Sequence, residues 1–204
     1  MSGIGKIRKV TDNPYLNFYE LEAIHRDGSV GSYYIASRIR DEKKIKAVSR
    51  RNDPDGVVMY GVYGPEKDRV VLIRQYRYPI GDYIYEFPAG LVEPGELLTQ
   101  AGIREMYEET GLTFSPVETG YSKPYFTTVG MTDESCGMVF GYCSGEPNSM
   151  HQEASEDIQV VIADREECRR ILREENVAIM CAYMLMHFVA SDGDPLKFLD
   201  GFPR

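Results

Sequence analysis

The sequence is poor in the residue types that zinc sites and disulfide frameworks need. Its 204 residues include three histidines, four cysteines and no tryptophan. The cysteines stand at positions 136, 143, 168 and 181, so no two of them form a C-x-x-C pair. A zinc site is therefore disfavoured, and we expect the cysteines to be reduced structural thiols.

Long apolar runs are missing as well. No window approaches 18 apolar residues, and the N-terminus has no apolar stretch of signal-peptide length. These absences predict a soluble, cytoplasmic protein.

An excess of positive charge is also absent, because the net charge is −9. Such a surface repels nucleic acids and anionic membranes, so neither is expected as a partner. A phosphorylated small molecule is not excluded, because a divalent metal ion can supply positive charge locally.

What the sequence does contain is enough apolar material for a sizeable core, at 43% of the residues. Residues 18–25 and 32–38 alternate like a β-hairpin around the turn at Asp27-Gly28. Residues 1–13 are expected to be loosely held, and residues 39–55 to form a linker. We predict a small antiparallel β unit over residues 1–50, which packs on the main domain or on a second subunit.

The main domain is predicted to span residues 57–204. Its segments do not alternate strictly between strand and helix, which favours an α+β fold with a mixed β-sheet sandwiched between helices. The second of the last two helices is expected to be largely buried. The predicted strands are 57–63, 69–76, 83–87, 117–123, 136–142 and 159–163; the helices are 97–110, 165–174 and 178–190; the loops are 88–95 and 144–157.

The most informative segment is the first of these helices. Glu105, Glu108 and Glu109 are spaced i, i+3 and i+4, so they share one side of the helix. Like charges at this spacing destabilise a helix by about 0.2–0.5 kcal/mol per pair. The stripe is either a solvated acidic face or a site for a cation, and carboxylate oxygens suit Mg²⁺.

The residues around this stripe identify it. Residues 90–112 read GLVEPGELLTQAGIREMYEETGL, which matches the Nudix box, G-x5-E-x7-R-E-U-x-E-E-x-G-U, where U is aliphatic. The sequence thus resembles the Nudix family. The resemblance implies a mixed β-sheet between helices and cleavage of a nucleoside diphosphate linked to a further group. The matching positions are Gly90, Glu96, Arg104, Glu105, Met106, Glu108, Glu109, Gly111 and Leu112.

The family resemblance also implies roles within the box. Glu105, Glu109 and the carbonyl of Ala89 would bind Mg²⁺, for which Mn²⁺ could substitute. Glu108 would be a further ligand or a partner of the attacking water, and Arg104 would orient the loop and the helix, together with Glu96.

The flanking residues resemble the ADP-ribose pyrophosphatase group of this family. The resemblance rests on RQYRYP at 74–79, YEFPAG at 85–90 and TTVGMTDE at 127–134, where Thr and Val replace the usual Ser-Pro. It implies hydrolysis of ADP-ribose to AMP and ribose 5-phosphate. Two alternatives stay open: another sugar nucleotide such as UDP-glucose or GDP-mannose, or a module that senses a nucleotide without cleaving it.

The same resemblance implies further site residues outside the box. Glu156 would join the metal ligands, and Glu153 would act as general base, with Glu134 as the second candidate. In this group the N-terminal unit packs across a homodimer and supplies aromatic residues that stack on the base. The residues implied in substrate binding are Tyr15, Tyr33, Arg38, Arg77 and Leu91.

Overall fold

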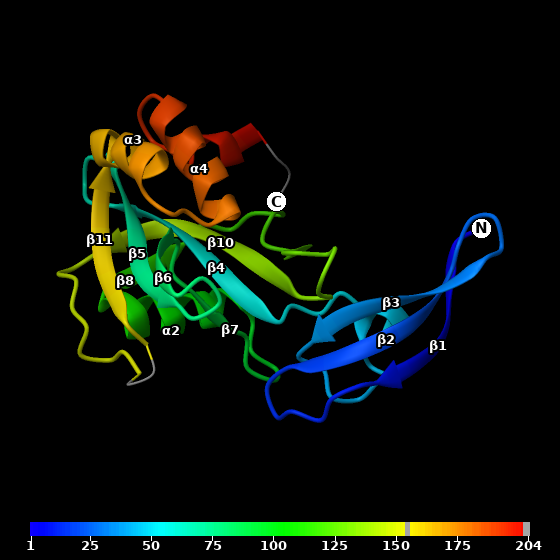
Figure 1. Ribbon diagram of the computed structural model, residues 1–204. Helices are drawn as coiled ribbons and strands as arrows, with labels where there is room; N and C mark the ends of the chain where they lie inside the picture. The colour runs from blue at the N-terminus through cyan, green and yellow to red at the C-terminus, as the bar shows by residue number, and fades with distance from the viewer. Residues whose placement is uncertain (154–155, 202–204) are drawn as a thin grey trace. The chain divides into compact units, whose positions relative to one another are not determined.

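The computed structural model describes residues 1–153 and 156–201. The chain divides into two compact units (Figure 1). Unit 1 consists of residues 1–55 and 124–136, and unit 2 consists of residues 56–123 and 137 onward. The small N-terminal unit is thus completed by a segment that comes more than sixty residues later in the chain.

Unit 1 is built on a three-stranded antiparallel sheet in the order β1-β2-β3. The strands are β1 (Gly3–Lys9), β2 (Asn17–Ile24) and β3 (Val30–Ser37). Gly28, with φ of +89°, lies in the turn of the predicted hairpin. The expectation that residues 1–13 are loosely held is wrong, because β1 pairs with β2 from Gly3↔Ile24 to Lys9↔Tyr19.

The segment from residue 39 to residue 55 is more ordered than the predicted linker. It contains the short helix α1 (Lys46–Ser49), and Lys46 is buried. The Lys46 ammonium lies 2.6 Å from the Asp55 carboxylate and also bonds the Ser135 hydroxyl. Lys46 thus links the two segments of unit 1, 1–55 and 124–136. The small core of this unit comprises Tyr19, Leu21, Ile35 and Ile45.

Unit 2 contains the larger sheet, whose main path is β11-β5-β4-β10-β8. The short strands β6 and β7 pair with β5 and β4, respectively, and β9 (Pro124–Phe126), which belongs to unit 1, pairs with β10. β10 begins in unit 1 and continues into unit 2. The bounds are β4 (Gly56–Tyr63), β5 (Arg69–Arg77), β6 (Asp82–Glu86), β7 (Ala89–Leu91), β8 (Thr113–Pro116), β10 (Ser135–Ser144) and β11 (Ile158–Asp164).

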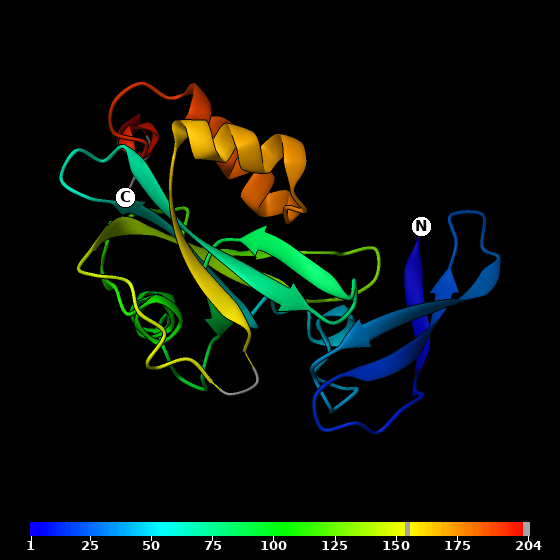
Figure 2. The ribbon, with the colours of Figure 1, turned by 60° about the vertical axis from the view of Figure 1, so that its left-hand side comes forward.

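Helices cover both faces of this sheet, as Figures 1 and 2 show. α2 (Leu98–Thr110) lies on one face, while α3 (Arg165–Glu174) and α4 (Ile179–Ala190) lie on the other. A 3₁₀ helix (Lys197–Gly201) follows α4. The predicted α+β sandwich is therefore confirmed.

The core between the sheet and α2 fixes that helix in place. Alternate residues of β4, Val57 and Met59, pack with Ala101 and Met106 of α2, and all four are fully buried. A strand that buries both faces needs apolar residues at successive positions, which β4 supplies from Val57 to Val62. α2 is thereby held beside β7, which it also contacts.

Three of the predicted elements differ from the structure. No strand forms at 117–123, where Thr119 and Ser122 form a turn, and β8 precedes that segment instead. The loop predicted at 88–95 contains β7, which pairs with β4. α4 is not largely buried, because Ile179, Tyr183 and Met186 are more than half exposed on one side of it.

Candidate active site

A glycine with positive φ stands on each side of α2. Gly95 has φ of +84° in the turn before the helix, and Gly111 has φ of +72° directly after it. The Gly111 N–H donates to the Tyr107 carbonyl at 2.8 Å, which ends α2 with the glycine cap that the sequence predicts.

Arg104 joins this loop to the helix. Its guanidinium donates two hydrogen bonds of 3.0 Å to the two carboxylate oxygens of Glu96, and a third of 3.0 Å to the Leu91 carbonyl. Its third nitrogen lies 2.8 Å from a Glu105 oxygen and 3.0 Å from a Glu108 oxygen. These partners raise the pKa of Arg104 and lower the pKa of Glu96, so both groups stay charged.

Burial distinguishes Glu109 from the other glutamates of the helix. It is 2% exposed, and the Ala89 N–H donates to its carboxylate at 3.0 Å. Burial raises its pKa well above the usual value, and the negative charges of Glu156 and Glu105 raise it further. Among the residues that the structure describes, no Lys, Arg or His forms an ion pair with it; the Ala89 N–H and the charge of Arg77 lower its pKa, but burial outweighs them.

Glu105 lies one helical turn before Glu109 and is also partly buried. Burial is the main cause that raises its pKa, and Glu108 and Glu156 add to the effect, while the hydrogen bond from Arg104 opposes it. Its carboxylate lies directly on the backbone of Gly90, where an added Cβ atom would be 1.9 Å from the carboxylate carbon. A side chain at position 90 would therefore displace Glu105.

The long loop after β10 returns to this end of α2. Glu156 lies there, and its backbone N–H donates to the Glu153 carbonyl at 3.0 Å. The Glu153 N–H in turn donates to a carboxylate oxygen of Glu156 at 3.2 Å. The Glu156 charge acts on both Glu105 and Glu109, so folding brings these three carboxylates together, although Glu156 is 47 residues from Glu109.

The carboxylate oxygens of Glu105, Glu109 and Glu156 are suitable ligands for a divalent metal ion. Within residues 1–153 and 156–201, no three His, Cys, Asp or Glu side chains already surround a common point as a finished metal cluster. Two of the carboxylates, Glu105 and Glu108, form ion pairs with Arg104. The charge of Glu156 raises the pKa of both Glu105 and Glu109, and oxygen-only donors such as these suit Mg²⁺ or Mn²⁺.

Arg77 and Leu91 also belong to this unit. Arg77 ends β5 and lies 2.6 Å from the Glu86 carboxylate, and its charge lowers the pKa of Glu109. Leu91 ends β7 and is 54% exposed. Arg77 therefore lies near Glu109, and the Leu91 carbonyl accepts a hydrogen bond from Arg104.

The other predicted site residues belong to unit 1. The Arg38 guanidinium lies 3.1 Å from the Glu134 carboxylate, and Glu134 also accepts a hydrogen bond from the Thr127 hydroxyl. The Tyr33 hydroxyl donates to the Gly130 carbonyl at 2.7 Å. Tyr15 is 78% exposed. Folding thus joins Arg38 with Glu134, which the sequence places 96 residues apart.

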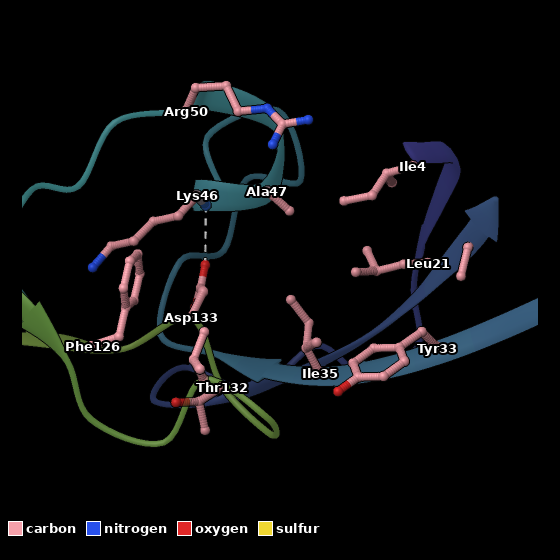
Figure 3. Close-up of a pocket in the computed structure, with 12 residues that line it drawn as sticks. Ile4, Leu21, Tyr33, Ile35, Lys46, Ala47, Arg50, Phe126, Thr132 and Asp133 are labelled. Atoms are coloured by element: carbon pink, nitrogen blue, oxygen red, sulfur yellow. Dashed lines mark hydrogen bonds between the residues drawn. The ribbon is translucent and has the colours of Figure 1, made fainter. Parts of the chain in front are cut away.

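Tyr33 also lines a cavity of about 420 Å³ within unit 1 (Figure 3). The sheet forms one wall and α1 another, and most of the lining side chains are apolar. Arg50 and Lys46 contribute the positive groups of the lining. Tyr33 therefore presents its ring to an open, mainly apolar surface.

The sequence analysis missed two residues that the structure places at the site. Glu86 is the ion-pair partner of Arg77, and Gln152 donates a hydrogen bond of 2.6 Å to the Glu109 carbonyl. The YEFPAG motif includes Glu86, so that residue could have been found. No local pattern marks Gln152, because its partner lies 43 positions earlier in the chain.

The fold and the site together define an α+β protein in which a glycine-bounded loop and a helix present buried glutamates. The model described as "NUDIX domain" matches residues 53–176, which is more than half of the chain. The chain belongs to the Nudix family. The resemblance predicted from the sequence is thus confirmed.

Individual relatives agree with this assignment. The chain is 37% identical over 132 residues to "Putative nudix hydrolase 2" of Caenorhabditis elegans, a match covering 62% of this chain and 56% of the relative. It is 52% identical over 42 residues to the "ADP-sugar pyrophosphatase" of Mus musculus, covering 21% and 19% of the two chains. The match thus spans about half of the first relative and a fifth of the second.

The fold agrees with a solved structure titled "Crystal structure of ADP compounds hydrolase". The TM-score is 0.68, with 98% of this chain and 95% of that chain covered, at 16% identity. At this identity the likeness concerns the fold. No helix in the described part of the chain is long and apolar enough to cross a membrane.

Proposed function

We propose that this protein hydrolyses the pyrophosphate bond of ADP-ribose or a related nucleoside diphosphate sugar, with Mg²⁺. The products are a nucleoside monophosphate and a sugar phosphate. The observation that carries this proposal is the buried Glu109, whose pKa is raised by burial and by the charges of Glu156 and Glu105. Buried carboxylates without a cation are costly to ionise, and they are retained where they bind metal.

In this proposal Glu105, Glu109, Glu156 and the Ala89 carbonyl hold the metal ion. A divalent ion bound there would polarise phosphoryl oxygens and would lower the pKa of a bound water molecule. The contact between the Ala89 N–H and Glu109 supports this assignment, because it fixes the Ala89 peptide beside the carboxylate.

The remaining residues bind, orient and transfer a proton. Arg104 holds the loop at Leu91 against α2, so the pyrophosphate is presented to a fixed set of glutamates. Arg77 contacts phosphate or ribose, and its ion pair with Glu86 orients it. Glu153 takes the proton of the attacking water, since it is exposed next to Glu156; Glu134 is the second candidate.

Unit 1 supplies base recognition in the proposal, through Tyr15, Tyr33 and Arg38 of a homodimer. Stacking on an aromatic ring contributes about 1–3 kcal/mol per base in nucleic-acid complexes. Unit 1 exposes much apolar surface, including the stacked rings of Phe18 and Tyr34, 5.6 Å apart. Unit 1 carries 11 Lys and Arg against 10 Asp and Glu, whereas unit 2 carries 12 Lys and Arg against 22 Asp and Glu. Unit 1 of one copy is therefore attracted electrostatically to unit 2 of another.

The test is a substrate panel with Mg²⁺ and an EDTA control. ADP-ribose, UDP-glucose, GDP-mannose, diadenosine polyphosphates and NADH are incubated with the protein, and monophosphate release is measured. We expect ADP-ribose to be cleaved fastest. Preference for UDP-glucose or GDP-mannose would keep the metal chemistry and contradict the choice of adenine. Nucleotide binding without release from any compound would favour the sensing module.

A further inference from the structure

The segment 148–153 makes repeated contact with the last turn of α2. The last four carbonyls of a helix have no partner within it, so other groups must satisfy them. Here the Gly111 N–H donates to the Tyr107 carbonyl, and the Asn148 N–H donates to the Thr110 carbonyl at 2.8 Å. The side-chain amide of Gln152 donates to the Glu109 carbonyl at 2.6 Å. Two of these three donors come from the segment 148–153.

Side-chain packing strengthens the same attachment. The rings of Tyr107 and His151 stack with centroids 4.6 Å apart and an interplanar angle of 30°. The Asn148 side chain covers Gly111 so closely that an added Cβ atom would lie 2.1 Å from its amide nitrogen. The segment is therefore seated on α2 at several points between Tyr107 and Gly111.

Gln152 is the contact nearest to the carboxylates. It is half-buried, its side chain bonds the backbone of the buried Glu109, and its chain neighbour is Glu153. The Glu153 N–H donates to the Glu156 carboxylate. A continuous series of bonds thus runs from the backbone of Glu109 through Gln152 and Glu153 to Glu156.

From this series we infer that Gln152 is a positioning residue, which sets where Glu153 and Glu156 lie relative to Glu105 and Glu109. This inference rests on the proposed function. Gln152 binds the backbone of Glu109, a proposed metal ligand, so the position of the loop depends on the position of the helix. A displacement of about 1 Å at such a site can lower a rate about 100-fold.

Three variants separate this role from a general effect on the loop. Gln152→Met keeps the size of the side chain and removes its N–H donor. Gln152→His keeps an N–H donor at a similar reach. Met150→Ala is the matched control, because Met150 is 79% exposed on the same loop and lies outside the proposed machinery.

We expect Gln152→Met to lower kcat about 10–100-fold, as for partners that orient metal ligands, with KM changed less than about 3-fold. Mn²⁺ affinity, measured by electron paramagnetic resonance with the metal alone, should fall about 10-fold. Gln152→His should recover most of both quantities, and Met150→Ala should match the wild type. The melting temperature of Gln152→Met should fall by only about 2–4 °C, because one hydrogen bond to the Glu109 carbonyl is lost.

Unchanged kcat and Mn²⁺ affinity in Gln152→Met would overturn the inference. Equal losses in Gln152→Met and Met150→Ala would overturn it too, because the effect would then belong to the loop as a whole. If the wild type binds Mn²⁺ but cleaves no compound of the panel, the proposed function fails, and Mn²⁺ affinity alone decides the role of Gln152. If the wild type does not bind Mn²⁺, both fail.

Discussion

At the scale of single residues, the three glutamates of α2 differ in burial more than in spacing. Glu108 keeps 45% of its side chain exposed and Glu105 keeps 13%, while Glu109 is 2% exposed as a residue. A buried carboxylate depends on its surroundings for every interaction that stabilises its charge. Glu109 is therefore the residue whose replacement tests the site most directly.

We expect Glu109→Gln to abolish nearly all turnover while the protein folds normally. The amide keeps an oxygen that accepts the Ala89 N–H, so packing is retained, but a metal ion loses a charged ligand. Activity and circular dichroism should be measured beside Glu166→Gln, an exposed glutamate of α3. Turnover near that of the wild type in Glu109→Gln would refute the metal site.

Gly90 offers a second test at this scale. An alanine there would place its Cβ atom 1.9 Å from the Glu105 carboxylate carbon, so Glu105 must move. We expect Gly90→Ala to lower kcat at least about 100-fold, because displacement of a ligand by about 1 Å has that effect. The control is Gly201→Ala, since Gly201 is exposed and nothing lies within 4 Å of a Cβ atom at that position. Equal activity of the two variants would contradict the prediction.

At the scale of elements, α2 is held by contacts at both ends. Arg104 attaches the loop before it, and Asn148 with Gln152 attaches the segment that covers its last turn. The sheet and the buried residues Ala101 and Met106 fix its middle. These contacts hold α2, and with it the glutamates, in one position, as a preorganised site requires.

The two glycines that flank α2 separate backbone strain from packing. Both Gly95 and Gly111 have positive φ, but nothing lies within 4 Å of a Cβ atom at Gly95, whereas Asn148 occupies that space at Gly111. We expect Gly95→Ala to cost about 1–2 kcal/mol of unfolding free energy, from the left-handed backbone alone.

Gly111→Ala should cost more, by about a further 1–3 kcal/mol, because Asn148 must also move. Denaturant unfolding of both variants measures the difference. Equal losses would show that the Asn148 side chain moves away from an added Cβ atom at little cost. They would contradict a firm attachment of the segment 148–153 to α2.

At the scale of the whole molecule, stability is coupled to pH and to metal. The pKa of Glu109 is raised above its usual value of 4.5 in the folded state, so the folded protein holds this proton more tightly than the unfolded chain. The resulting stabilisation is fully present below about pH 4.5 and is lost as pH rises through the raised value. Glu105 contributes in the same direction.

Without metal, we therefore expect the contribution of Glu109 to the unfolding free energy to decline as pH rises above about 4.5. Mg²⁺ or Mn²⁺ should stabilise the protein more at higher pH, because ligands must be ionised to bind. Unfolding curves at several pH values, with EDTA or with metal, measure both effects. Glu109→Gln should flatten the metal-free dependence, and an unchanged slope in that variant would exclude Glu109 as its source.

The oligomeric state belongs to this scale too. If apolar surface on unit 1 is covered by a second copy, light scattering should give twice the chain mass of 23.2 kDa. Unit 1 carries 11 Lys and Arg against 10 Asp and Glu, and unit 2 carries 12 against 22, so dissociation of the copies at high salt would point to this charge difference. A clean monomer at low salt would contradict the sharing of Tyr15 and Tyr33 across a dimer.

Much of the fold follows from local pattern. Val57 to Val62 and Val70 to Ile73 are continuous apolar runs, and they form the central strands β4 and β5. Gly111 ends α2 as predicted, because a left-handed cap favours glycine. The strand predicted at 117–123 failed because short alternation there competes with turn-forming Thr119 and Ser122.

The sequence alone determined the family and the charged stripe of the site. The spacing of the Nudix box is local, so Glu105, Glu108 and Glu109 could be placed on one side of a helix from geometry. Their unequal burial, the contact of Glu105 with Gly90 and the bond from Gln152 to Glu109 were decided only by tertiary structure. These depend on which distant segments pack against α2, and pairing over 43 residues leaves no periodic signal in a single chain.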